Sequence, residues 1–124
     1  MPCLLVLVVD DVESVRRLIR RILEHAGHRV LEASDGVEAL ACLAANPAVE
    51  LVLTDLRMPN MDGWELATRL SGRSPRVPAL FMSGYADQDS RTAVPPGANF
   101  LNKPFSGQEL TAAVEAVLKG PTVS

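Results

Sequence analysis

Short apolar runs alternate with stretches of helical periodicity along the whole chain. Five runs have the apolar character of strands, and they cover residues 4–9, 29–32, 49–54, 79–82 and 98–102. Apolar residues at helical spacing predict helices over about 12–26, 36–45, 62–70, 87–94 and 106–118. The run at 29–32 is shorter and more polar, so we expect it nearer the edge of a sheet.

Helix start and stop signals support these segments. An acceptor residue followed three positions later by Glu marks a helix start at Asp35, Asp62 and Ser106. Gly27 stops the first helix. The helix before it is predicted by apolar residues that recur at helical spacing, namely Val12, Val15, Leu18, Ile19, Ile22, Leu23 and Ala26.

Five strands alternating with five helices predict an α/β fold. Right-handed crossovers give a doubly wound, three-layer (βα)5 fold of the flavodoxin-like kind. Its parallel five-stranded sheet has the order 2-1-3-4-5. We expect one domain over residues 1–124, with a core at about 4–118 and a short tail at 119–124. The carboxyl ends of the first and third strands then flank the point where ligands of such sheets bind.

Charge and hydropathy narrow the classes of function. The net charge is −3, and the only basic cluster, Arg16, Arg17, Arg20 and Arg21, is interpreted as a solvated helix face. This balance argues against direct nucleic-acid binding. No apolar run approaches the roughly 20 residues of a membrane helix, and no signal-peptide pattern is found. We therefore expect a cytoplasmic domain without membrane contact.

Polar residues follow four of the predicted strands. Asp10 and Asp11 come after the first, Asp55 after the third, Ser83 after the fourth and Lys103 after the fifth. Each residue alone has an ordinary explanation, such as a helix cap or a surface lysine. Because the carboxyl ends of parallel strands meet at one edge, their joint placement predicts a site.

The chemistry of these residues suits phosphoryl transfer. Clustered carboxylates repel one another unless a cation joins them. Mg²⁺ prefers oxygen ligands, and it commonly binds one or two carboxylates together with phosphate oxygens. A carboxylate also serves as a nucleophile that forms an aspartyl phosphate. We therefore expect Mg²⁺ as the cofactor, with Mn²⁺ as an alternative.

The same motifs resemble the receiver domain of two-component response regulators. They are the acidic pair after the first strand, TDLRMP with MDG around Asp55, SG at Ser83 and KPF at Lys103. The resemblance covers about residues 4–118. It implies that Asp55 is the phosphoacceptor and that Asp10 or Asp11, with Asp55, holds Mg²⁺. It also implies that the Arg57 backbone carbonyl completes the metal site and that Ser83 and Lys103 stabilise the phosphoryl group.

The resemblance further implies a switch between Ser83 and the aromatic residue three positions before Lys103, which is Phe100. On phosphorylation, Ser83 moves towards the phosphoryl oxygen and Phe100 rotates into the space it leaves. In this family, the positions of Arg57 and Tyr85 tune the lifetime of the phosphoryl group.

Two features of this sequence that depart from the general family pattern indicate the kind of protein to which the domain belongs. The FMSGY segment and the proline-interrupted stretch before the fifth strand are most similar to receivers of hybrid sensor histidine kinases. We therefore expect a fragment of such a kinase, which would make it the cytoplasmic part of a membrane-bound protein, with a stand-alone single-domain regulator as the alternative. The implied partners are a histidine kinase or histidine phosphotransfer domain and an unidentified downstream protein. We expect no enzyme activity beyond self-phosphorylation and autodephosphorylation.

Two other functions fit the sequence less well. An aspartyl-phosphate phosphatase of the haloacid dehalogenase type needs a second Asp two residues after the nucleophile, where this chain has Arg57. A flavin carrier of the flavodoxin type needs a phosphate-binding loop after the first strand. This chain has two anionic residues there, Asp10 and Asp11.

Overall fold

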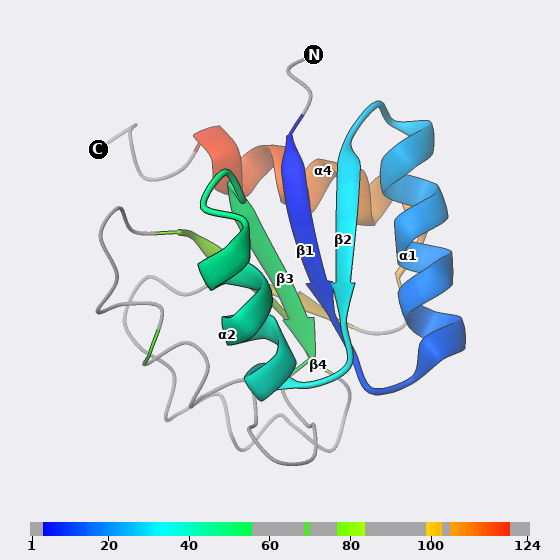
Figure 1. Ribbon diagram of the computed structural model, residues 1–124. Helices are drawn as coiled ribbons and strands as arrows, with labels where there is room; N and C mark the ends of the chain where they lie inside the picture. The colour runs from blue at the N-terminus through cyan, green and yellow to red at the C-terminus, as the bar shows by residue number, and fades with distance from the viewer. Residues whose placement is uncertain (1–3, 56–68, 70–76, 84–98, 103–104, 120–124) are drawn as a thin grey trace.

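A parallel five-stranded sheet with helices on both faces forms the domain (Figure 1). The computed structural model describes residues 4–55, 69, 77–83, 99–102 and 105–119. The strands are β1 (Leu5–Val9), β2 (Arg29–Ala33), β3 (Leu51–Asp55), β4 (Ala79–Ser83) and β5 (Asn99–Asn102). The helices are α1 (Glu13–His25), α2 (Gly36–Ala45) and α4 (Gly107–Lys119). The order β2-β1-β3-β4-β5 confirms the predicted topology. Of the helix predicted near 62–70 only Arg69 is described, and it is helical, while the helix predicted near 87–94 lies outside the described residues.

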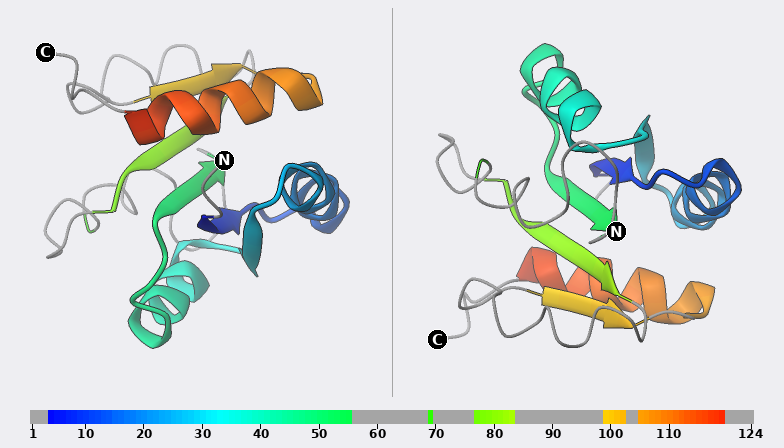
Figure 2. Two further views of the ribbon diagram at one scale, coloured as in Figure 1. Left: turned by 90° about the horizontal axis from the view of Figure 1, so that it is seen from above. Right: turned by 90° about the horizontal axis from the view of Figure 1, so that it is seen from below.

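The pleat of β1 divides the core into two halves. Val6 and Val8 pack with residues of α1 and α4 on one face of the sheet. Leu5, Leu7 and Val9 pack with residues of α2 on the other face. All five side chains are buried, which is why the strand reads as a continuous apolar run. Figure 2 shows α2 on one side of the sheet and α4 on the other.

Only part of the apolar series in α1 is buried. Ile19 and Leu23 are almost fully buried, but Leu18 is 59% exposed and Val12 is 47% exposed. At about 100° per residue, Leu18 lies too far around the helix from the line of Ile19 and Leu23 to reach the core. Helical spacing therefore predicts α1 correctly, but it does not by itself place Leu18 in the core.

Gly27 ends α1 as predicted. Its φ of 98° lies in the left-handed region, which glycine adopts without steric cost. Its N–H donates to the Glu24 carbonyl at 3.0 Å, so the chain turns sharply before β2 begins. A Cβ at Gly27 would meet nothing within 4 Å, so the constraint is conformational rather than one of space.

Two predicted helix caps are confirmed. Asp35 Oδ1 accepts from the Glu38 N–H at 2.8 Å at the start of α2. At the start of α4, Ser106 Oγ accepts from the Glu109 N–H at 3.0 Å, and Glu109 Oε1 accepts from the Ser106 N–H at 2.9 Å. This reciprocal pair satisfies two N–H groups that the helix itself leaves without acceptors.

We expect Ser106→Ala to lower the free energy of unfolding by about 0.5–2 kcal/mol, because the cap of α4 is lost. Urea unfolding, monitored by circular dichroism, measures the change in the free energy of unfolding. Ser14→Ala is the matched control, since Ser14 is exposed in the first turn of α1. An equal loss in both variants would show that the Ser106 cap has no particular role.

None of the helices in the described part of the chain combines the length and the apolar character needed to cross a bilayer.

Candidate functional site

The carboxyl ends of β1 and β3 bring two aspartates together. The strands are parallel neighbours, and Val9 pairs with Thr54 in the last register position. The next residues along each strand, Asp10 and Asp55, therefore emerge side by side at the same edge of the sheet. This is the position that the strand order predicted.

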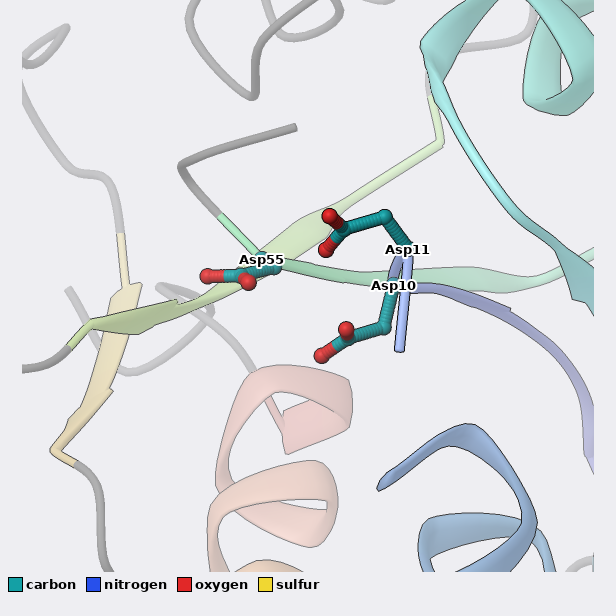
Figure 3. Close-up of side chains that lie close together, drawn as sticks. All are labelled: Asp10, Asp11 and Asp55. Carbon is teal, nitrogen blue, oxygen red and sulfur yellow. The ribbon is translucent and has the colours of Figure 1, made fainter. Parts of the chain in front are cut away.

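Three carboxylates meet at this edge (Figure 3). Asp10 is fully buried, Asp55 is 9% exposed, and Asp11 is exposed. One carboxylate oxygen from each residue can be chosen such that all three lie within 4.8 Å of one another. The structure thus brings together all three of the predicted acidic residues.

The donor set fits a small, hard divalent cation. Two oxygens on opposite sides of an octahedral Mg²⁺ lie about 4.1 Å apart. The cluster is therefore at most slightly wider than one ion spans. All three donors are carboxylate oxygens, which Mg²⁺ prefers over nitrogen or sulfur.

Local hydrogen bonds fix the chain at both strand ends. The Asp10 N–H donates to the Ala33 carbonyl at 3.1 Å, which continues the β1–β2 pairing by one step. Asp10 Oδ1 accepts from the Val12 N–H at 2.9 Å. On the neighbouring strand, the buried Thr54 hydroxyl donates to the Asp55 carbonyl at 2.9 Å. The two aspartates therefore sit on restrained backbone, as positioning requires.

The sequence interpretation missed a polar link behind the site. Arg16 Nη1 donates to the Asp10 carbonyl at 2.8 Å, and Arg16 Nε donates to Glu32 Oε1 at 3.1 Å. The Arg16 side chain is only 14% exposed, whereas that of Arg17 is 69% exposed. The interpretation of the basic cluster as a solvated face holds for Arg17 but is wrong for Arg16. The spacing in the sequence could have revealed this, because Arg16 lies three residues before Ile19 and seven before Leu23. It therefore shares the helix face of these two buried residues.

Glu32 lies between two guanidinium groups. Arg20 Nη1 donates to Glu32 Oε2 at 2.8 Å, and Arg16 takes the other oxygen. The hydrogen bond from Arg20 is the main reason that the pKa of Glu32 lies below its ordinary value of 4.5; burial opposes this, and Arg16 adds to it. The ionised form of Glu32 is therefore stabilised more in the folded chain than in the unfolded one.

We expect Glu32→Gln to lower the free energy of unfolding by on the order of 1 kcal/mol near pH 7. Because the pKa is lowered by folding, this contribution is present above about pH 4.5 and is lost as the pH falls through the folded value. Urea unfolding at several pH values measures the difference between the two proteins. Glu13→Gln is the control, since within the described part of the chain Glu13 pairs with Arg17 alone, at the surface. A difference that does not shrink on acidification would contradict the charge-based explanation.

Other predicted site residues are described only in part. Ser83 ends β4 and Phe100 lies in β5, but their side chains are outside the described part. Arg57, Tyr85 and Lys103 lie outside the described residues. The described residues thus cover the acidic half of the predicted site.

Comparison with known proteins identifies the family. The family described as the response regulator receiver domain matches residues 6–115. The response regulator MprA of Mycobacterium tuberculosis is 40% identical over 116 residues, which span 92% of this chain and 50% of MprA. The sensor kinase CckA of Brucella abortus is 38% identical over 117 residues, which span 92% of this chain and 12% of the kinase. The chain is thus similar both to a response regulator and to a sensor kinase, and it spans half or less of each.

The solved structures agree with this result. A response regulator receiver domain protein from Clostridium thermocellum superposes with a TM-score of 0.87 at 28% identity. The superposition covers 97% of this chain and 98% of that one. With the parallel sheet, the acidic edge and the family match in agreement, the chain belongs to the response regulator receiver domain family of two-component signalling.

Proposed function

We propose that Asp55 accepts a phosphoryl group in a Mg²⁺-dependent reaction, and that phosphorylation changes which partners the domain binds. The observation that carries this proposal is the approach of Asp10, Asp11 and Asp55 to within 4.8 Å at the ends of β1 and β3. Membership of the receiver family supports it independently.

The chemistry is a displacement at phosphorus. An Asp55 carboxylate oxygen forms a bond to phosphorus, while the bond from phosphorus to the donor breaks and its electron pair leaves with the donor. The product is an acyl phosphate on Asp55. Asp10 and Asp11, with Asp55 and the Arg57 backbone carbonyl, would hold the ion. Bound Mg²⁺ supplies neutralisation of the charge on the phosphoryl oxygens.

The remaining site residues keep the roles that the sequence predicts. Ser83 and Lys103 would each contact a phosphoryl oxygen, and Arg57 and Tyr85 would tune the lifetime of the acyl phosphate. A coupling between Ser83 and Phe100 would report phosphorylation to the surface. The backbone register supports this coupling, because Ser83 pairs with Asn102 and Phe100 lies two residues earlier on the same strand.

The wider context is also proposed. The donor is the phosphohistidine of a histidine kinase or of a histidine phosphotransfer domain, and the recipient of the signal is a protein rather than DNA. The chain acts as one receiver domain with its core at about 4–118, and it transforms no external substrate. A fragment of a hybrid histidine kinase is the first proposal for its origin, and a stand-alone regulator is the second. The cytoplasmic location stays a prediction of the sequence.

Incubation with acetyl phosphate tests the function. We expect intact-mass measurement to show one added phosphoryl group when Mg²⁺ is present and none when EDTA replaces it. Beryllofluoride, a tetrahedral mimic of a phosphoryl group, should change the NMR signals of residues at the same sheet edge. If no donor phosphorylates the protein at any Mg²⁺ concentration, the proposal is wrong.

A further inference from the structure

We propose that Arg16 is a positioning residue of the acidic site. It contacts the backbone of Asp10 rather than a carboxylate of the cluster, and it holds the end of β1 so that Asp10 and Asp11 both face Asp55. This inference rests on the metal-dependent function proposed above. It assigns a role in metal affinity to a helix residue that is not itself a ligand.

The two contacts of Arg16 use both arms of its fork at once. Nη1 donates to the Asp10 carbonyl at 2.8 Å, and Nε donates to Glu32 Oε1 at 3.1 Å. Glu32 is held in turn by Arg20 at 2.8 Å. A planar guanidinium with both arms engaged is a rigid connector. The end of β1 is thereby tied to β2 by a side chain of α1.

The contact acts on the peptide that leads to Asp11. The carbonyl of Asp10 and the N–H of Asp11 belong to one planar peptide unit, so fixing that oxygen fixes the plane from which Asp11 departs. The Asp10 N–H belongs to the preceding peptide, and it donates to the Ala33 carbonyl. Asp10 lies just beyond the end of β1 at Val9, so the strand ladder alone does not set this plane. Arg16 supplies the restraint at that point.

Charge and positioning predict opposite effects of removing Arg16. A guanidinium bound to the Asp10 carbonyl places a positive charge beside a cation site, and that charge repels Mg²⁺. On charge alone, replacing Arg16 with a neutral residue would tighten Mg²⁺ binding. If Arg16 instead holds the ligands in place, the same replacement weakens binding. The sign of the change therefore separates the two effects.

Isothermal titration calorimetry with MgCl₂ and no phosphoryl donor tests the inference. We expect Arg16→Met to raise the Kd for Mg²⁺ about tenfold, which is typical of losing a residue that orients metal ligands. Arg16→Lys keeps the charge but cannot engage both acceptors as a fork, so we expect a smaller rise. Arg17→Met is the matched control: it removes the same charge one residue further on, from an exposed side chain, and should leave the Kd unchanged.

Several results would overturn the inference. An unchanged or lower Kd in Arg16→Met would exclude positioning, and so would a loss of stability in urea without a change in Kd. If Arg16→Met does not fold, Arg16→Lys decides the question, and a Kd equal to that of the wild type would exclude positioning. Failure of the wild-type protein to bind Mg²⁺ would overturn both the proposed metal site and this inference. Mg²⁺ binding by the wild type with no effect at Arg16 would overturn this inference alone.

Discussion

Replacing Asp55 with asparagine is expected to abolish phosphorylation by acetyl phosphate. The substitution preserves the size of the side chain but removes the carboxylate that attacks phosphorus. It also removes one of the three donors in the acidic cluster. We expect the phosphoryl mass increment to disappear. Mg²⁺ binding measured by calorimetry should weaken in the same variant.

Asp35→Asn is the matched control for this prediction. Asp35 caps α2 through its side chain, and asparagine caps helices about as well as aspartate does. This variant should be phosphorylated at the wild-type rate. A mass increment that persists in Asp55→Asn but is lost in Asp10→Asn or Asp11→Asn would place the acceptor on another carboxylate of the cluster.

Leu23→Ala is expected to destabilise the domain more than the loss of the Ser106 cap or of the Glu32 charge. Leu23 is fully buried in α1 and belongs to the core half that includes Val6 and Val114. Truncation removes buried apolar surface and leaves a cavity, at a cost of about 2–5 kcal/mol. Domains of this size have a free energy of unfolding of about 5–15 kcal/mol, so the variant loses a large part of its total stability.

Leu18→Ala provides the comparison within the same helix. The chemical change is identical, and the helix propensity of alanine affects both positions alike. Leu18 is 59% exposed, so we expect a change within about 0.5 kcal/mol. The midpoint of urea unfolding measures both variants. Equal losses at the two positions would show that Leu18 is buried in solution.

The sequence predicted the acidic site because two strong regularities combine there. Four of the five predicted strands are followed directly by a polar residue. The right-handed crossover rule then leaves few possible strand orders. In the predicted order, 2-1-3-4-5, the first and third strands are neighbours. The approach of Asp10 and Asp55 follows from that order without knowledge of any side-chain contact.

The exact limits of β3 were harder to predict. The apolar run begins at Val49, whereas the strand begins at Leu51. Val49 is 4% exposed and packs in the core, but its N–H donates to the Asn46 carbonyl in a turn rather than to a neighbouring strand. Burial and strand pairing are different requirements, and hydrophobicity reports only the first.

The link through Arg16 could not be predicted from composition. Its partner Glu32 lies 16 residues away, and the contact depends on how α1 packs beside β2. In the sequence, Arg16 stands among three other arginines and looks like one more surface charge. Only its phase on the helix separates it from them. Tertiary packing selects one arginine of the four to lie against the end of β1.

The pleat of β1 has a consequence for how this gene can change. Val6 and Val8 face one half of the core, and Asp10 continues their even-numbered series. Leu51 and Leu53 of β3 lead in the same way to Asp55. Deleting one codon inside either strand would invert its faces and displace its aspartate in a single event. Insertions and deletions that evolution retains in this domain are therefore expected to fall outside β1 and β3.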